Sequence, residues 1–294
     1  MPRVAVVDMG SNSTRLLIAD VAPDGAITEL ARRSTVTRLG QGVDANGALA
    51  AEAMERVFAV LADFRETIDA LGADHTVGVL TSATRDAANG VQFAATVRER
   101  FAIAARTIDG DEEARLTYLG ATSEHRATVP TAVIDIGGGS TEIVLGHHDA
   151  LRLHVSTQVG VVRHTERHLH HDPPTADELA RLRADAATTF AAELPADLGA
   201  QAAIAVAGTA TQSAAVLGSE HLERAELEAL LARLAALALT QRREVAGLDP
   251  DRAPTIVAGV AILLEAMTAL GLGAVEVSDH DILRGAALQY TAFP

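Results

Sequence analysis

The chain of 294 residues contains neither cysteine nor lysine, and both absences exclude kinds of chemistry. Without cysteine there is no disulfide, no cysteine nucleophile and no thiolate metal site, and a reducing, cytoplasmic location is expected. Without lysine there is no Schiff base, no lysine general base and no Walker-type lysine on a phosphate. All 24 basic residues are arginine, so an anionic ligand has to be bound by arginine, backbone N–H groups, hydroxyl groups or a metal ion.

Aromatic residues are scarce as well, at 3% of the chain with no tryptophan, so alanine, valine, leucine and isoleucine must build the core. Hydrophobic residues make up 48% and charged residues 21%, which is typical of a soluble globular protein and excludes disorder for most of the chain. The length predicts two domains or one large domain.

The net charge is strongly negative, at −15 with an isoelectric point near 5.1. Such a field repels nucleic acid and anionic membranes, so neither is expected as a partner, although a local arginine pocket can still bind phosphate. Asp8 interrupts the first apolar run, and no signal peptide is predicted. The most apolar stretch, Thr255 to Val277, carries Glu265 in its middle, which favours a buried helix leading into a strand over a membrane span.

Short β-branched runs alternate with segments of helical periodicity. The runs 4–7 and 14–19 flank a polar turn, which predicts a hairpin, and residues 47–71 carry apolar side chains at helical spacing up to Gly72. A second cycle of strand, glycine turn and strand begins at Thr131. Strands and helices mixed with many crossovers predict the α/β class.

Two segments match each other without a gap. Residues 6–18, VVDMGSNSTRLLI, align with residues 133–145, VIDIGGGSTEIVL, so that Asp8 coincides with Asp135. Two copies of one strand–turn–strand unit, each opening a domain, imply a duplicated fold with a cleft between its halves.

The composition of the two turns favours phosphate binding. Glycine and small polar residues let the backbone approach a ligand closely, and their N–H and hydroxyl groups can surround an anion. The alternative is a plain hairpin turn in each copy. The candidate phosphate-binding residues are Gly10, Ser11, Asn12, Ser13, Gly137, Gly138, Gly139, Ser140 and Thr141.

Several motifs in order along the chain resemble those of one family. They are DMGSNS at 8–13, TSATRDA at 81–87, GDEEARL at 110–116 with YLG at 118–120, DIGGGSTE at 135–142, QVGVVR at 158–163, GTAT at 208–211 and SDHDILRG at 278–285. Together they are similar to the exopolyphosphatase/guanosine pentaphosphate phosphohydrolase (Ppx/GppA) family of the actin/sugar-kinase/Hsp70 superfamily. The resemblance covers essentially the whole chain.

This resemblance implies two actin-like, ribonuclease H-like α/β domains with the active site in the cleft between them. We expect them at residues 1–124 and 125–294, with the last helix packing back on the first domain. Longer members carry further helical domains, so the chain resembles the short, two-domain type. Members of the family are often dimers, and a homodimer is expected.

The implied activity is release of terminal orthophosphate from inorganic polyphosphate, of short chains in particular. Guanosine pentaphosphate is an alternative substrate. A non-enzymatic nucleotide or alarmone sensor on the same fold is a second alternative. A sugar or acyl kinase of the superfamily is a third, but no catalytic aspartate for it can be identified.

Glu113 is the candidate catalytic base, because the glutamate of the family lies in the block EEAR. Attack on a terminal phosphorus needs an oriented water and an acceptor for its proton. The alternative is that Glu112 and Glu113 both serve the helix dipole in a first turn. We expect this of Glu112.

Asp135 and Glu142 stand at the two ends of the second turn, where a hairpin brings them together, and the resemblance supports a shared Mg²⁺ or another divalent cation. Asp8 is a possible outer-sphere contributor. The alternative for Glu142 is a strand residue that faces solvent. The repeat places Arg15 where the second copy has Glu142.

Arg85 is expected to bind a phosphate oxygen and to stabilise the transition state, because an arginine near a helix N-terminus is unfavourable without an anion. Gly208 and Thr209 lie between a strand and a helix and are a candidate site for a second phosphate. The histidines of residues 164–171 have some metal-ligand spacing, but a solvated surface turn is expected there.

Overall fold

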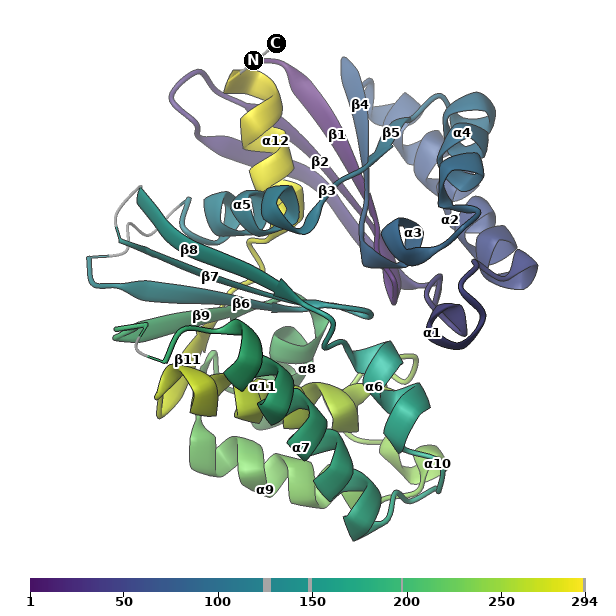
Figure 1. Ribbon diagram of the computed structural model, residues 1–294. Helices are drawn as coiled ribbons and strands as arrows, with labels where there is room; N and C mark the ends of the chain where they lie inside the picture. Colours follow the sequence, from purple (N-terminus) through teal and green to yellow (C-terminus); the bar gives the residue numbers. More distant parts are fainter. Residues whose placement is uncertain (124–127, 148–149, 197, 293–294) are drawn as a thin grey trace. The chain divides into compact units, whose positions relative to one another are not determined.

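In the computed structural model the described residues are 1–123, 128–147, 150–196 and 198–292. The side chains of residues 291 and 292 are not described. The chain divides into two compact units (Figure 1). Unit 1 consists of Met1–Ser123 and His280–Pro294, and unit 2 of Glu124–Asp279. The boundary expected between residues 124 and 125 lies outside the described residues.

Unit 1 is built on a five-stranded sheet of order β3-β2-β1-β4-β5. Its strands are β1 (Arg3–Met9), β2 (Ser13–Val21), β3 (Ile27–Val36), β4 (His75–Leu80) and β5 (Ala104–Thr107). Its helices are α1 (Val43–Asn46), α2 (Ala51–Leu71), α3 (Ser82–Asp86), α4 (Gly90–Phe101), α5 (Gly110–Ala121) and α12 (Ile282–Ala292).

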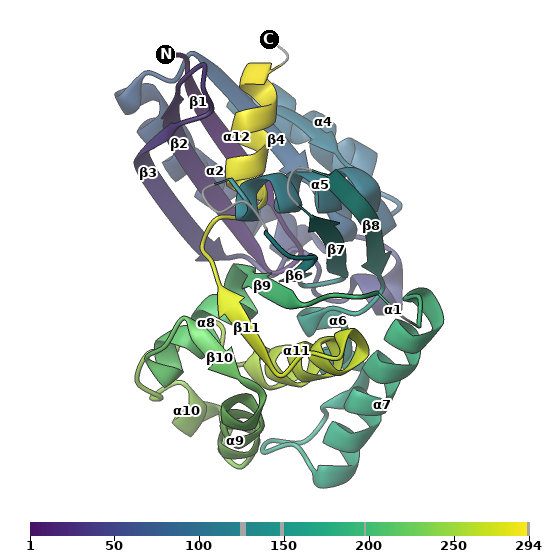
Figure 2. The ribbon, with the colours of Figure 1, turned by 90° about the vertical axis from the view of Figure 1, so that its left-hand side faces the viewer.

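The central strand β1 is buried on both faces, which explains its continuous apolar run. Ala5 and Val7 face a core shared with α2 and α4, whereas Val4 and Val6 face a core shared with α5 and α12. Figure 2 shows α12, the last helix of the chain, lying along this sheet. Helix α2 ends at Gly72, whose left-handed backbone closes the last turn, as its periodicity predicts.

Unit 2 is built on a six-stranded sheet of order β10-β11-β9-β6-β7-β8. Its strands are β6 (Thr131–Ile136), β7 (Thr141–His147), β8 (Ala150–Thr157), β9 (Ala202–Val206), β10 (His221–Glu223) and β11 (Ala274–Val277). Its helices are α6 (Val161–His168), α7 (Ala176–Glu193), α8 (Ala207–Leu217), α9 (Arg224–Ala235), α10 (Leu239–Arg242) and α11 (Ile256–Leu270).

Helix α11 is the centre of the unit 2 core and is buried on nearly all sides. Its one acidic residue, Glu265, accepts a hydrogen bond of 2.6 Å from Arg183 of α7, which makes burial of the carboxylate tolerable. The apolar stretch is therefore a core helix followed by a strand, as expected. Among the described residues, no helix has both the length and the hydrophobicity needed to cross a membrane.

The internal repeat is visible in both sheets. In each, the first strand pairs with an antiparallel second strand and a parallel fourth one, and the third strand extends the antiparallel side. The register is also the same, with Asp8 opposite Arg15 and Asp135 opposite Glu142. The expected α/β class, with two related units, is confirmed.

Candidate active site

In each unit the predicted site residues follow parallel strands that lie side by side. Met9 is opposite Leu80 on β1 and β4, and Asp135 is opposite Val206 on β6 and β9. The turn at 10–13 and helix α3 therefore start from one edge of the first sheet. The turn at 137–140 and helix α8 likewise start from one edge of the second. The carboxyl ends of adjacent parallel strands are where open α/β sheets bind ligands.

In the first turn, two backbone carbonyls accept hydrogen bonds from the segment that follows β3. The N–H of Gly40 donates to the carbonyl of Ser11 at 2.8 Å, and the N–H of Thr37 donates to the carbonyl of Asn12 at 3.0 Å. In a planar trans peptide the N–H points opposite to the carbonyl. The N–H groups of Asn12 and Ser13 thus point away from residues 37–40, in position to donate to an anion.

The second turn is held in a similar way by α6. First-turn N–H groups of this helix donate to the carbonyls of Gly137 and Gly138 at 2.9 and 2.8 Å, and Nε of Arg163 donates to the carbonyl of Gly139 at 2.8 Å. By the same peptide geometry, the N–H groups of Gly138, Gly139 and Ser140 point away from α6. Three consecutive N–H groups of this kind form an anion-binding concavity.

This close packing requires glycine at position 160. A Cβ there would collide with the carbonyl oxygen of Gly138 and the carbonyl carbon of Gly139. The hydroxyl of Thr141 is also used within the protein, because it donates to the carbonyl of Val159 at 2.6 Å. Of the predicted phosphate ligands, Thr141 thus supports the turn and has no hydroxyl proton left for a ligand.

Asp135 and Glu142 lie directly opposite each other on β6 and β7, and they are only 7% and 1% exposed. Ser156 donates to Oε1 of Glu142 at 2.9 Å. The alternative of a solvent-facing Glu142 is therefore wrong. Like charges directly opposite each other on paired strands repel, and a divalent cation bound by both carboxylates offsets this repulsion. Their oxygens are the hard ligands that Mg²⁺ prefers, so the pair fits a divalent ion.

Asp8 has a different neighbour at the matching place. Arg15 donates to its Oδ2 from Nε at 2.9 Å and from Nη2 at 2.5 Å, and Nη1 of Arg15 also pairs with Asp281. Burial raises the pKa of Asp8, and the guanidinium of Arg15 opposes this rise. Oδ1 of Asp8 is buried and has no hydrogen-bond partner among the described residues. Such an atom suits a water bound to a metal ion.

Arg85 and Glu113 are in contact. Nη1 of Arg85, on α3, donates to Oε2 of Glu113 at 3.1 Å and to the carbonyl of Ile108 at 3.0 Å. Glu113 lies in the first turn of α5 and is 7% exposed. The arginine thus holds a buried carboxylate in one orientation and stabilises its charged form.

Glu112, the neighbour of Glu113, points elsewhere. It pairs with Arg106, and this hydrogen bond is the main reason that the pKa of Glu112 lies below its ordinary value. Its backbone N–H is capped by the side chain of Asp109 at 2.8 Å. The two adjacent acids are therefore distinguished by burial, since only Glu113 sits in a buried environment.

The turn at Gly208 and Thr209 opens helix α8 immediately after β9. The guanidinium of Arg252 lies against Gly208, so close that a Cβ there would collide with it. Nε of Arg252 lies 3.8 Å from Oδ2 of Asp249, and a phosphate at this positive end of the helix would add a second anion beside the guanidinium. Arg252 is thus a candidate ligand for the same phosphate, and the sequence motifs did not reveal it.

The prediction of a solvated turn at 164–171 is wrong for its first histidine. His164 lies on α6 and is 1% exposed, whereas His170 and His171 are exposed. Burial lowers the pKa of His164 to about 4, so its imidazole is neutral at neutral pH.

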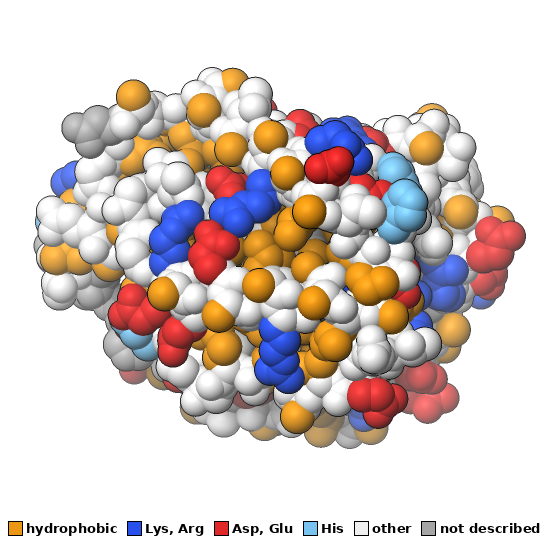
Figure 3. All heavy atoms as spheres, turned by 90° about the horizontal axis from the view of Figure 1, so that it is seen from below, with side chains coloured by type: hydrophobic (Ala, Val, Ile, Leu, Met, Phe, Trp, Pro, Cys, Tyr) orange, Lys and Arg blue, Asp and Glu red, His pale blue; other side chains and the backbone are white. Residues whose placement is uncertain are grey.

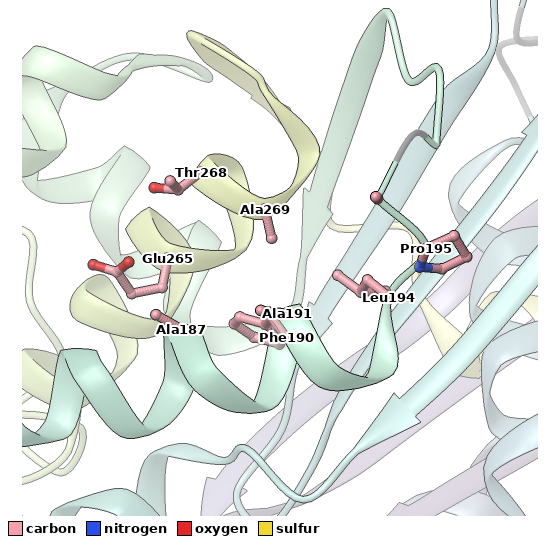
Figure 4. A pocket seen from close by; sticks show the side chains of 9 residues that line it. Ala187, Phe190, Ala191, Leu194, Pro195, Glu265, Thr268 and Ala269 are labelled. Atoms are coloured by element: carbon pink, nitrogen blue, oxygen red, sulfur yellow. The ribbon is translucent and has the colours of Figure 1, made fainter.

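A pocket of about 370 Å³ between α7 and α11 has a different character. Figure 4 shows Phe190 of α7, Leu194 just after this helix and Ala269 of α11 around the pocket, with Glu265 at one end. On the face drawn in Figure 3, basic side chains lie next to acidic ones among many hydrophobic ones. An apolar lining with a carboxylate cannot bind a polyanion, so this pocket is not the phosphate site.

Comparison with known proteins decides the family. The Ppx/GppA phosphatase family matches residues 17–288. Exopolyphosphatase 2 of Mycobacterium tuberculosis is 38% identical, over 98% of this chain and 98% of its own. The chain belongs to the Ppx/GppA phosphatase family. The resemblance drawn from the motifs is thereby confirmed.

Solved structures of this family are also similar to the chain. An exopolyphosphatase-like protein superposes with a TM-score of 0.91 at 32% identity, over 98% of this chain and 97% of its own. A Ppx/GppA family member from Aquifex aeolicus gives 0.81 at 26% identity, over 99% and 98%. Each superposition covers nearly the whole of both chains, so this chain is similar to these relatives in length as well as in fold.

Proposed function

We propose that this Ppx/GppA phosphatase is an exopolyphosphatase, which releases orthophosphate from the end of inorganic polyphosphate. The observation that carries the proposal is the duplicated turn. In the first turn the N–H groups of Asn12 and Ser13 point away from residues 37–40. In the second turn the N–H groups of Gly138, Gly139 and Ser140 point away from α6. A substrate with many phosphates suits a protein with two such turns, and the similar exopolyphosphatases support this choice.

In the proposed reaction, Glu113 accepts a proton from a water molecule that attacks the terminal phosphorus in line. The new O–P bond forms as the anhydride P–O bond breaks, and the shortened chain leaves with the electron pair. Arg85 holds the carboxylate of Glu113 and adds positive charge near the phosphoryl oxygens. Gly208, Thr209 and Arg252 bind a further phosphate of the chain.

Mg²⁺ or another divalent ion is part of the proposal. Asp135 and Glu142 would hold it, because they lie opposite each other on β6 and β7. When bound, the ion neutralises charge on the phosphate oxygens. A homodimer and a cytoplasmic location are also proposed, the first from the family resemblance and the second from the absence of cysteine. Light scattering on the purified chain tests the dimer.

The activity is tested by measuring phosphate release from short polyphosphate, long polyphosphate and guanosine pentaphosphate, each with and without Mg²⁺. We expect Mg²⁺-dependent release, fastest from short polyphosphate. Faster release from guanosine pentaphosphate would reassign the substrate. No release from any of the three would favour the sensor.

The role of Glu113 is tested with Glu113→Gln, which keeps the size of the side chain and removes its basicity. Loss of a general base lowers kcat by about 10²- to 10⁴-fold. Glu112→Gln is the matched control, because the adjacent Glu112 pairs with Arg106. Unchanged turnover in Glu113→Gln would remove this residue from the mechanism.

A further inference from the structure

Two histidines and an aspartate cluster between α6 and α7 of unit 2, and the proposed hydrolysis uses none of them. His164 and His168 stand one helical turn apart on α6, and Asp185 comes from α7. One ligand atom of each lies within 4.8 Å of the others. Two imidazoles and a carboxylate are a ligand set typical of zinc.

The spacing of these atoms is close to what a metal ion needs. Nε2 of His168 lies 2.8 Å from Oδ2 of Asp185, and Nε2 of His164 lies 3.6 Å from the same oxygen. Ligands at about 2.0–2.2 Å from a tetrahedral zinc ion are about 3.3 Å apart. Both distances to Asp185 are therefore within about 0.5 Å of this separation.

A second observation points to a ligand. His164 is 1% exposed, and its Nε2 has no hydrogen-bond partner within the described part of the chain. A buried polar atom of this kind is rare and calls for an explanation. Oδ2 of Asp185 lies 3.6 Å from this Nε2, just beyond hydrogen-bond distance, so Nε2 lies beside the other two ligand atoms without bonding to either.

Two weak contacts oppose a bound cation. The N–H of Gly160 lies 3.4 Å from Nδ1 of His164, and ligation through Nε2 places the ring proton on Nδ1 and gives up this long contact. Nη1 of Arg167 lies 4.0 Å from Asp185, but its side chain is 39% exposed and can turn towards water. Neither contact is strong enough to prevent a cation from binding to the three ligand atoms.

We infer that His164, His168 and Asp185 form a binding site for a divalent transition-metal ion, with Zn²⁺ as the best match and water in the remaining coordination positions. The side chain of Asp185 is 37% exposed, which provides a path for the ion. Imidazole ligands favour Zn²⁺ over Mg²⁺, whereas the all-oxygen pair of Asp135 and Glu142 favours Mg²⁺. The two sites should therefore be loaded independently.

The test is calorimetric titration of Zn²⁺ into the full chain, purified without a histidine tag, stripped with chelator and held in a phosphate-free buffer. We expect one Zn²⁺ per chain at this site. Co²⁺ should give the visible absorption of a nitrogen–oxygen site of low coordination number. His168→Gln and Asp185→Asn should each weaken Zn²⁺ binding by about tenfold or more. His170→Gln, in an exposed neighbour of the same type, should not.

Equal Zn²⁺ affinity in the wild type, His168→Gln and Asp185→Asn would overturn the proposal, and so would a lack of Zn²⁺ binding by the wild type. Circular dichroism establishes that each variant is folded, and Asp185→Asn is the gentler change because Asp185 is partly exposed. Mg²⁺-dependent phosphate release should be unchanged in both variants. The metal site and the proposed hydrolase activity are thus judged by separate measurements.

Discussion

Glu142 lies directly opposite Asp135 across β6 and β7, at the place where the first repeat has Arg15 opposite Asp8. All four residues follow one backbone register, yet their charges differ. Arg15 neutralises Asp8 within unit 1, whereas Glu142 adds a second carboxylate in unit 2. A duplicated hairpin has thus become an ion pair in one copy and a candidate cation site in the other.

The carboxylate pair predicts how activity depends on Mg²⁺. Glu142→Gln removes one charged ligand, so we expect at least about tenfold more Mg²⁺ for half-maximal phosphate release. Glu276→Gln, on an exposed residue of β11, is the control. An unchanged Mg²⁺ requirement would exclude Glu142 as a ligand.

Removal of Arg15 should destabilise unit 1. Arg15→Met leaves Asp8 buried without its cation, which typically costs about 3–5 kcal/mol. The exposed pair of Arg65 and Asp69 is the matched control, because Arg65→Met should cost less than about 1 kcal/mol. Urea unfolding followed by circular dichroism measures both. Equal costs in the two variants would mean that the Asp8 pair is no stronger than a surface one.

Gly160→Ala should disturb the second turn. Its Cβ would collide with the backbone of Gly138 and Gly139, which forces the turn to move and typically costs about 1–3 kcal/mol. We expect a raised KM for polyphosphate, because the N–H groups of this turn are proposed to bind phosphate. Gly273→Ala is the control, since open space surrounds that glycine. If both variants keep the wild-type KM, the turn does not bind substrate.

Glu178 should make stability depend on pH in acid. It is buried and accepts hydrogen bonds from the side chain of His171 at 2.8 Å, the N–H of Thr175 at 2.9 Å and the N–H of His170 at 3.0 Å. These bonds, that of His171 first, lower its pKa to about 2.

The contribution of Glu178 is therefore fully present above its ordinary pKa near 4.5 and is lost as the pH falls towards 2. Glu178→Gln should lower the urea midpoint at pH 6 and lower it less at pH 3. Asp177→Asn, in the same helical turn, should show no such change. A difference between wild type and Glu178→Gln that is the same at both pH values would contradict this account.

Much of the fold follows from the pattern of the chain. The β-branched run of β1 and the helical spacing of α2 are local signals, and the repeat of residues 6–18 at 133–145 predicts two related units. The start of α5 is a local feature as well, because the side chain of Asp109 accepts a hydrogen bond from the N–H of Glu112.

The sequence by itself determined the α/β class, the duplicated strand–turn–strand unit and the kinds of chemistry that a chain without lysine or cysteine can carry out. Only the tertiary structure decided that Glu113 is buried against Arg85 while Glu112 faces Arg106, and that Arg252 lies at the start of α8. It also brought Asp185 to the histidines of α6. Such contacts join residues that lie up to dozens of positions apart, and which side chains meet depends on how strands and helices pack, not on local periodicity.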